Sequence, residues 1–125
     1  MSAADTTTRS AVSNYIELIA KGNAAELTEL YAEDATIEDP VGSEVRRGHA
    51  AIRDFYTVIE NLDREAELVS LKVTGNEAAF LWRLTLTAGD TRSQIEPIDT
   101  MTFGDDGKIT SMRAFWSPAD LRVLE

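Results

Sequence analysis

The sequence predicts a single α+β domain in which helices cover one face of a curved, mostly antiparallel sheet. Apolar residues recur at helical spacing as far as Asn61, and from Glu67 onward they alternate at period two. Turn signals at Gly75-Asn76, Gly89-Asp90 and Asp106-Gly107 separate the alternating runs. Helices followed by strands are typical of an α+β domain, and a curved sheet with helices across its mouth encloses a pocket.

Length and composition favour an intracellular globular protein. The 125 residues fit one domain spanning residues 1–125, and 43% hydrophobic and 27% charged residues are ordinary values. The absence of cysteine excludes disulfides and thiolate metal sites. No run approaches the roughly 18 apolar residues of a membrane helix, and the first residues lack signal-peptide features, so a cytoplasmic location is expected by default. The net charge of -10 argues against nucleic-acid and anionic-membrane partners.

Three helices are expected in the first half. The first begins among the cap hydroxyls of Thr6–Thr8 and ends at Gly22. Its apolar stripe consists of Val12, Tyr15, Ile16 and Ile19. A capping box at Asn23 and Glu26 begins a second, short helix, whose stripe is Leu27, Leu30 and Tyr31. The third follows Gly48, with Ile52, Phe55, Tyr56 and Ile59 on one face.

Five strands are expected, at Ala35–Asp39, Glu67–Val73, Ala78–Thr87, Thr91–Phe103 and Lys108–Trp116. Alternation places Val69, Leu71 and Val73 on one side of the second strand. The third has apolar residues on both faces, with Phe80 and Trp82 opposite Leu81. A bend is expected at Pro97 in the fourth, because proline cannot donate to the ladder.

Asp39 is the first candidate for chemistry. Pro40 pushes the residue before it into extended geometry, and neighbouring strand residues point to opposite faces. Asp39 therefore shares a face with Ile37, whereas Glu38 points the other way. We interpret Asp39 as the base of an enzyme and Glu38 as a solvated surface acid.

Asp99 is the second candidate, and its strand parity allows two interpretations. In the first, Asp99 faces inward with Ile95, Pro97, Met101 and Phe103. A carboxyl among apolar side chains avoids the cost of ionisation by staying protonated, and a protonated carboxyl donates a hydrogen bond. In the second, a bulge at Pro97 reverses the parity and exposes Asp99.

The three tyrosines, Tyr15, Tyr31 and Tyr56, all lie on apolar stripes. Such a tyrosine is most often a core residue, although three together also fit the wall of a pocket. His49 is the only histidine, so a histidine metal site is not expected. The acids around Asp34 lack the spacing of a calcium loop, and no phosphate loop or nucleophile motif occurs. The sequence predicts no metal and no cofactor.

Several of these segments together resemble the bacterial Δ5-3-ketosteroid isomerases. The matching segments are Tyr15, Ala35–Ser43, Ala51–Tyr56, Asn76–Phe80, Pro97–Asp99 and Ser111–Ala114. They occur in order over nearly the whole chain. The resemblance implies a cone-like fold of the nuclear-transport-factor-2 type, a 3-oxo-steroid substrate and a homodimer formed by packing of sheets. That family is an established example of an aspartic acid kept neutral by its apolar site.

The resemblance also implies roles for individual residues. Asp39 is expected to be the general base, with Tyr15 and protonated Asp99 as hydrogen-bond donors to the C3 oxygen. Tyr31 and Tyr56 match tyrosines that support Tyr15, and Trp116 matches a tryptophan near the base. The expected apolar pocket surface consists of Phe55, Phe80, Phe103, Met112 and Trp116.

Two alternatives compete with an isomerase. One is another enzyme on the same fold, such as a polyketide cyclase, a dehydratase or an epoxide hydrolase with an Asp-Arg-Asp set. Arg83 and Arg113 are the arginines considered for that set, but parity points Arg113 away from Trp116. The other alternative is a non-catalytic module that binds a steroid or lipid.

Overall fold

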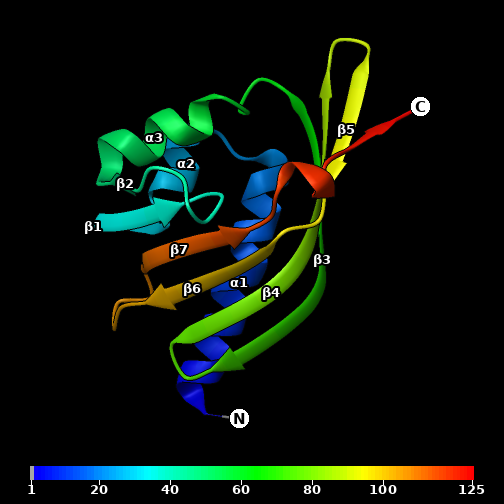
Figure 1. Cartoon of the computed structure of the whole chain (residues 1–125). Coiled ribbons are helices and arrows are strands. Elements are labelled where there is room, and N and C mark those ends of the chain that lie inside the picture. Colours follow the sequence, from blue (N-terminus) through cyan, green and yellow to red (C-terminus); the bar gives the residue numbers. More distant parts are fainter. Residues whose placement is uncertain (1) are drawn as a thin grey trace.

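In the computed structural model, which describes residues 2–125, three helices cover one face of a curved eight-stranded sheet (Figure 1). The helices are α1 (Ala3–Lys21), α2 (Ala24–Thr28) and α3 (His49–Thr57). The strands are β1 (Tyr31–Glu38), β2 (Arg46–Arg47), β3 (Asp63–Thr74), β4 (Glu77–Ala88), β5 (Thr91–Ile95), β6 (Ile98–Phe103), β7 (Ile109–Phe115) and β8 (Arg122–Leu124). The sheet order is β2-β1-β7-β6-β4-β5-β8, with β3 also paired to β4. Only the β1–β7 pair is parallel among these pairings, so the predicted α+β class is confirmed.

The helices differ from prediction at two ends. α1 begins at a capping box formed by Ser2 and Asp5, so the threonines that we expected to cap it lie inside the helix. The Ser-x-x-Asp spacing carries this signal, because each side chain accepts a backbone N–H of the other residue. The second capping box, at Asn23 and Glu26, forms as predicted. α2 is shorter than predicted, and Tyr31 begins β1 rather than closing a helical stripe.

Two departures from simple alternation affect the predicted strands: a register shift in β3 and a break at Pro97. The β3–β4 register shifts between Leu68 and Ser70, which leaves Val69 44% exposed and not on the side of Leu71. The prediction for Val69 was wrong because one extra residue reverses parity. The predicted strand Thr91–Phe103 is divided into β5 and β6, as a proline at position 97 favours. β8 was not predicted.

The concave face of the sheet and the apolar stripes of the helices form the core. Val12, Ile19, Leu27, Ile37 and Ile52 are all buried in it. Figure 1 shows α1 running across the sheet, with α2 and α3 grouped beside β1. None of the described helices is both long and apolar enough to cross a membrane.

Candidate active site

A cavity of about 380 Å³ opens between the helices and the concave face of the sheet. This volume is within the usual range for small-molecule sites, about 300–1,000 Å³. Most of its wall is apolar, formed by Ile19, Phe55, Val58, Ile59, Leu84, Leu86, Ile95, Pro97 and Leu121. The polar side chains on the wall are Tyr15, Asp39, Arg46, Tyr56, Trp82 and Trp116. An apolar hollow with a few convergent polar groups suits a mostly hydrophobic ligand that has a reactive polar end.

Asp39 lies at the end of β1, on the wall of this cavity and before a cis Asp39–Pro40 bond. Burial raises the pKa of its carboxyl, whereas the Trp116 hydrogen bond and the charge of Arg46 lower it. The Trp116 indole Nε1–H donates to Oδ1 of Asp39 at 2.6 Å. Since a carboxylate has a second oxygen, Oδ2 can accept a proton from a ligand.

Asp99 is the second residue of β6, an interior strand of the sheet, and it is 1% exposed on the same buried face as Met101 and Phe103. Of the two interpretations of its parity, the inward one is therefore correct. The pKa of Asp99 is raised from its ordinary value of 3.8 to about 8. Burial is the main cause and the charge of Asp39 contributes, whereas Trp82 acts in the opposite direction. Neither carboxyl oxygen has a hydrogen-bond partner among residues 2–125. At neutral pH the group is a protonated donor beneath the wall of the cavity.

Three tyrosine hydroxyls form a buried hydrogen-bonded chain. The hydroxyls of Tyr31 and Tyr56 are 2.5 Å apart, and Tyr56 donates to the hydroxyl of Tyr15 at 3.4 Å. Because each hydroxyl has one proton, the order of donation is Tyr31 to Tyr56 to Tyr15, and the proton of Tyr15 is available to a ligand. Burial is the main cause that raises the pKa of all three well above the ordinary value of 10.0, so they remain protonated.

The cavity therefore combines one acceptor with two donors. Asp39 provides a carboxylate, while Tyr15 provides a hydroxyl and Asp99 a neutral carboxyl. Asp99 is close enough to Tyr15 for a negative charge on it to raise the pKa of that tyrosine. Such an arrangement can remove a proton from carbon and stabilise the negative charge that develops on a carbonyl oxygen.

The comparisons with known proteins agree with this geometry. Residues 12–112 match the SnoaL-like domain family. A curated relative, steroid Delta-isomerase of Nocardioides simplex, is 47% identical over 115 residues, which cover 92% of this chain and 94% of the relative. The chain belongs to the SnoaL-like family and, within it, to the steroid Δ-isomerases. This membership confirms the predicted resemblance and the nuclear-transport-factor-2-like fold.

Solved structures share the SnoaL-like fold over nearly the whole chain. SalBIII, an epoxide hydrolase/cyclase-like enzyme with a role in pyran ring formation in polyether salinomycin, is 31% identical with a TM-score of 0.86. The match covers 95% of this chain and 97% of SalBIII. RV0760c of Mycobacterium tuberculosis has a TM-score of 0.87 at 20% identity, over 94% and 96% of the two chains. The second likeness is one of fold alone.

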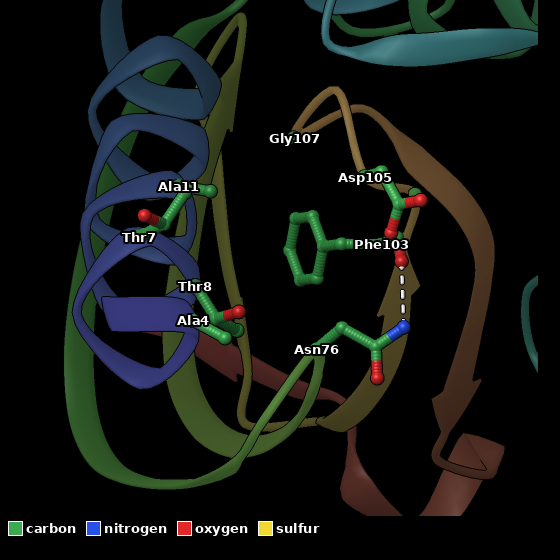
Figure 2. Close-up of a pocket in the computed structure, with 9 residues that line it drawn as sticks. Ala4, Thr7, Thr8, Ala11, Asn76, Phe103, Asp105 and Gly107 are labelled. Atoms are coloured by element: carbon green, nitrogen blue, oxygen red, sulfur yellow. Dashed lines mark hydrogen bonds between the residues drawn. The ribbon is translucent and has the colours of Figure 1, made fainter. Parts of the chain in front are cut away.

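Five apolar residues were expected to line the pocket of this chain. Two of them, Phe55 and Trp116, line the cavity. Phe80 and Met112 face inward but are fully buried behind the wall, where Phe80 packs edge-on against Tyr15. Phe103 points instead into a second hollow, of about 180 Å³, between the first half of α1 and the turn after β6 (Figure 2). Strand parity separates inner from outer faces, but it does not separate core from cavity wall.

Sequence reasoning missed two polar residues of the cavity. Arg46 lies on β2, with its guanidinium 5.3 Å from the ring centre of Phe55. No periodic pattern marks a two-residue strand, so its position could not be predicted. Trp82 was placed on the correct face of β4, but without a role. His49, at the start of α3, donates its Nε2–H to the carbonyl oxygen of Tyr31.

The outward-facing charged residues form ion pairs on the other side of the sheet. Glu38 accepts from Arg113 Nε and from the Gly42 N–H, both at 2.9 Å, and its side chain is 20% exposed. Glu38 is therefore outside the cavity, as predicted, but it is ion-paired rather than only solvated, because β1 and β7 pair it directly with Arg113. Arg83 pairs with Glu96 and Glu67. Neither arginine lines the cavity.

Proposed function

We propose that this chain moves the C5–C6 double bond of 3-oxo-Δ5-steroids to C4–C5 by proton transfer through a dienolate. The observation that carries this proposal is the arrangement of two carboxyls at one apolar cavity, beside an available tyrosine proton. Asp39 lines the cavity and accepts from Trp116, whereas Asp99 is fully buried beneath its wall. Two like groups whose surroundings push their pKa values apart are typical of a division between base and acid. The steroid Δ-isomerase relative supports the same activity.

In the first step, Oδ2 of Asp39 takes a proton from C4 of the steroid. The electrons of the C4–H bond form a C3–C4 double bond, and those of the carbonyl pass to the C3 oxygen. Tyr15 and protonated Asp99 donate hydrogen bonds to this oxyanion, which strengthen as its charge develops. In the second step, the C5–C6 π electrons take the proton at C6 from the Asp39 carboxylic acid. The oxyanion electrons reform the C3 carbonyl, and the C3–C4 π electrons move to C4–C5. No atom is gained or lost and no cofactor is consumed.

The apolar wall supports a steroid as the ligand. Side chains from α1, α3, β4 and β5 contribute to it, and their shared chemistry suits a rigid hydrocarbon skeleton. Tyr31 and Tyr56 would then be supporting residues, since their hydrogen-bonded chain leaves the proton of Tyr15 directed to the ligand. Trp116 would hold Asp39 with one oxygen free.

The test is incubation of the purified chain with a 5-ene-3-ketosteroid, followed by the ultraviolet absorbance of the conjugated enone. We expect rapid conversion that is lost in Asp39→Asn. No acceleration over buffer would overturn the isomerase proposal. A steroid with deuterium at C4 sharpens the test. If one base serves both carbons, part of the deuterium should appear at C6 of the product.

A second candidate function follows from the likeness to SalBIII. Arg46 and Asp39 lie on one cavity, which provides a carboxylate and a cation for opening an epoxide. The epoxide hydrolase mechanism uses an Asp-Arg-Asp set. Among residues 2–125, only Asp39 lines the cavity as a carboxylate, and Asp99 is buried and neutral, so the isomerase is favoured. A parallel assay with an epoxide substrate separates the two: formation of diol or cyclic ether without enone formation would favour the second candidate.

We also propose that the chain forms a homodimer through the outer face of its sheet. Leu81, Ile98 and Phe115 occupy paired positions on β4, β6 and β7, and they form an apolar row across that face. Ile98 is 48% exposed and Phe115 43% exposed in the single chain. A second copy packed there would cover this row, which explains why β4 has apolar residues on both faces. Sedimentation should give a dimer for the native chain and a monomer for Ile98→Glu.

A further inference from the structure

Three unpartnered polar atoms lie under one part of the cavity wall. They are Nε1 of Trp82 and both carboxyl oxygens of Asp99, which have no hydrogen-bond partner among residues 2–125. Buried polar groups in native proteins are nearly always paired, so an orphaned donor beside an orphaned acceptor calls for an explanation. Trp82 is 4% exposed and Asp99 is 1% exposed, so bulk water does not serve either group.

The sheet places these two side chains on the same face. Asp99 on β6 pairs with Phe80 on β4, and the backbone N–H of Trp82 donates to the carbonyl of Pro97. Trp82 is therefore the diagonal neighbour of Asp99, within reach of a long side chain. The indole also packs edge-on against Tyr15, with ring centres 6.0 Å apart. Trp82 thus contacts one proposed oxyanion donor and lies beside the other.

We propose that Trp82 is a positioning residue of the oxyanion site: its indole N–H donates to the carbonyl oxygen of the protonated Asp99 carboxyl. This bond turns the carboxyl O–H toward Tyr15 and the ligand oxygen. An indole N–H can only donate, so it matches the accepting oxygen of a neutral carboxyl and leaves the other oxygen to donate. A side chain of similar shape without the N–H would fill the wall but leave the carboxyl free to rotate.

The electrostatic effect of Trp82 on its neighbour agrees with this contact. The indole N–H lowers the pKa of Asp99, in opposition to burial, which is the larger effect. The other titratable groups that influence or face Asp99 are Tyr15 on α1, Tyr31 and Asp39 on and after β1, and Tyr56 on α3. The tyrosines stay protonated over the range in which Asp99 titrates, and Asp39 carries the only other carboxyl among these groups.

The role of Trp82 as a positioning residue rests on the proposed isomerase function, but its contact with Asp99 does not. The contact is measured by nuclear magnetic resonance of the indole N–H. The chain has two tryptophans, so Trp116→Phe leaves one indole signal, that of Trp82. We expect this signal to shift as Asp99 titrates, and to lose that shift when Asp99→Asn is added. A signal that does not move, or one that moves equally with Asn at position 99, overturns the proposal.

A double-mutant cycle tests the catalytic consequence. Trp82→Phe should lower kcat about threefold to tenfold, the effect of one hydrogen bond, and should have no further effect in Asp99→Ala. In Trp82→Phe the alkaline fall of activity should also move to higher pH, because removal of a donor raises the pKa of Asp99. Equal losses of kcat in both backgrounds would reduce Trp82 to a wall residue and overturn the positioning role. If no variant isomerises steroids, the proposed function fails while the resonance experiment still decides the contact.

Discussion

Asp39 and Asp99 are the same side chain at one cavity, yet their surroundings differ: Asp39 lines the cavity, whereas Asp99 is buried beneath its wall. Asp39 is half-buried at the end of a strand, where Trp116 donates to it and Arg46 lies nearby. Asp99 is on the inner face of β6, an interior strand of the sheet, and its pKa is raised to about 8, mainly by burial. Burial raises the pKa of both carboxyls. At Asp39 the Trp116 donor and the charge of Arg46 oppose this rise, whereas Asp99 has no cation near it among the described residues and no access to bulk water.

The difference shows that position in the sheet, more than residue type, decides what a carboxyl does. A strand end reaches the cavity mouth, where solvent and a short polar strand provide compensation for a charge. A central strand position provides apolar neighbours on the same face. Each of the following changes alters one side of this contrast.

Asp39→Asn should cause the largest loss. An amide has the same shape as a carboxylate but cannot accept the C4 proton, so kcat should fall by about 10²–10⁴-fold, the usual contribution of a positioned base. Enone formation under single-turnover conditions measures it. Glu38→Gln is the matched control, since Glu38 is the next residue along the chain but pairs with Arg113 outside the cavity. Equal losses in the two variants would show that Asp39 has no specific role.

Asp99→Ala should have the next largest effect. It removes one donor to the oxyanion, which typically lowers kcat by about 10²–10³-fold. Asp99→Asn keeps a donor at the same place and should recover part of the loss. Binding of a planar phenolic steroid, which mimics the dienolate, provides a second measurement that should weaken in Asp99→Ala. Full activity in the alanine variant would remove Asp99 from the site.

The stability of the protein should also report the environment of Asp99. Between pH 3.8 and about 8 the folded chain keeps this proton while the unfolded chain has lost it. Folded protein then binds one proton more, so the free energy of unfolding should fall as pH rises, by about 1.4 kcal/mol per pH unit from this group. Urea unfolding measures the free energy of unfolding across this pH range. Its fall with pH should be less steep in Asp99→Asn than in the native chain. An unchanged slope would show that Asp99 titrates near its ordinary value.

The sequence indicated Asp39 and Asp99 as candidates for different reasons. Pro40 and strand alternation were enough to orient Asp39 toward the cavity. Asp99 stayed ambiguous, because a bulge reverses parity without a strong sequence signal. One such register shift does reverse the parity of a predicted strand, but it lies at Val69 on β3. Arg46 and the partners of Trp82 depend on contacts between distant segments, such as β2 against β1 and β4 against β6. Local periodicity does not encode these contacts.

Arg46→Gln should have the smallest effect, and it tests the charged side of the contrast. Arg46 lowers the pKa of Asp39, so its removal raises that pKa. Because the base must be ionised, the acid limb of kcat/KM should move to higher pH. The shift should be less than about one pH unit, since Arg46 is exposed and its charge is screened by solvent. Arg47→Gln is the matched control on the same strand, as its side chain donates to the carbonyl of Asp34. Added salt should reduce the difference in the pH of the acid limb between the native chain and Arg46→Gln. If this difference persists at high salt, or if Arg47→Gln reproduces it, the charge of Arg46 does not act on Asp39.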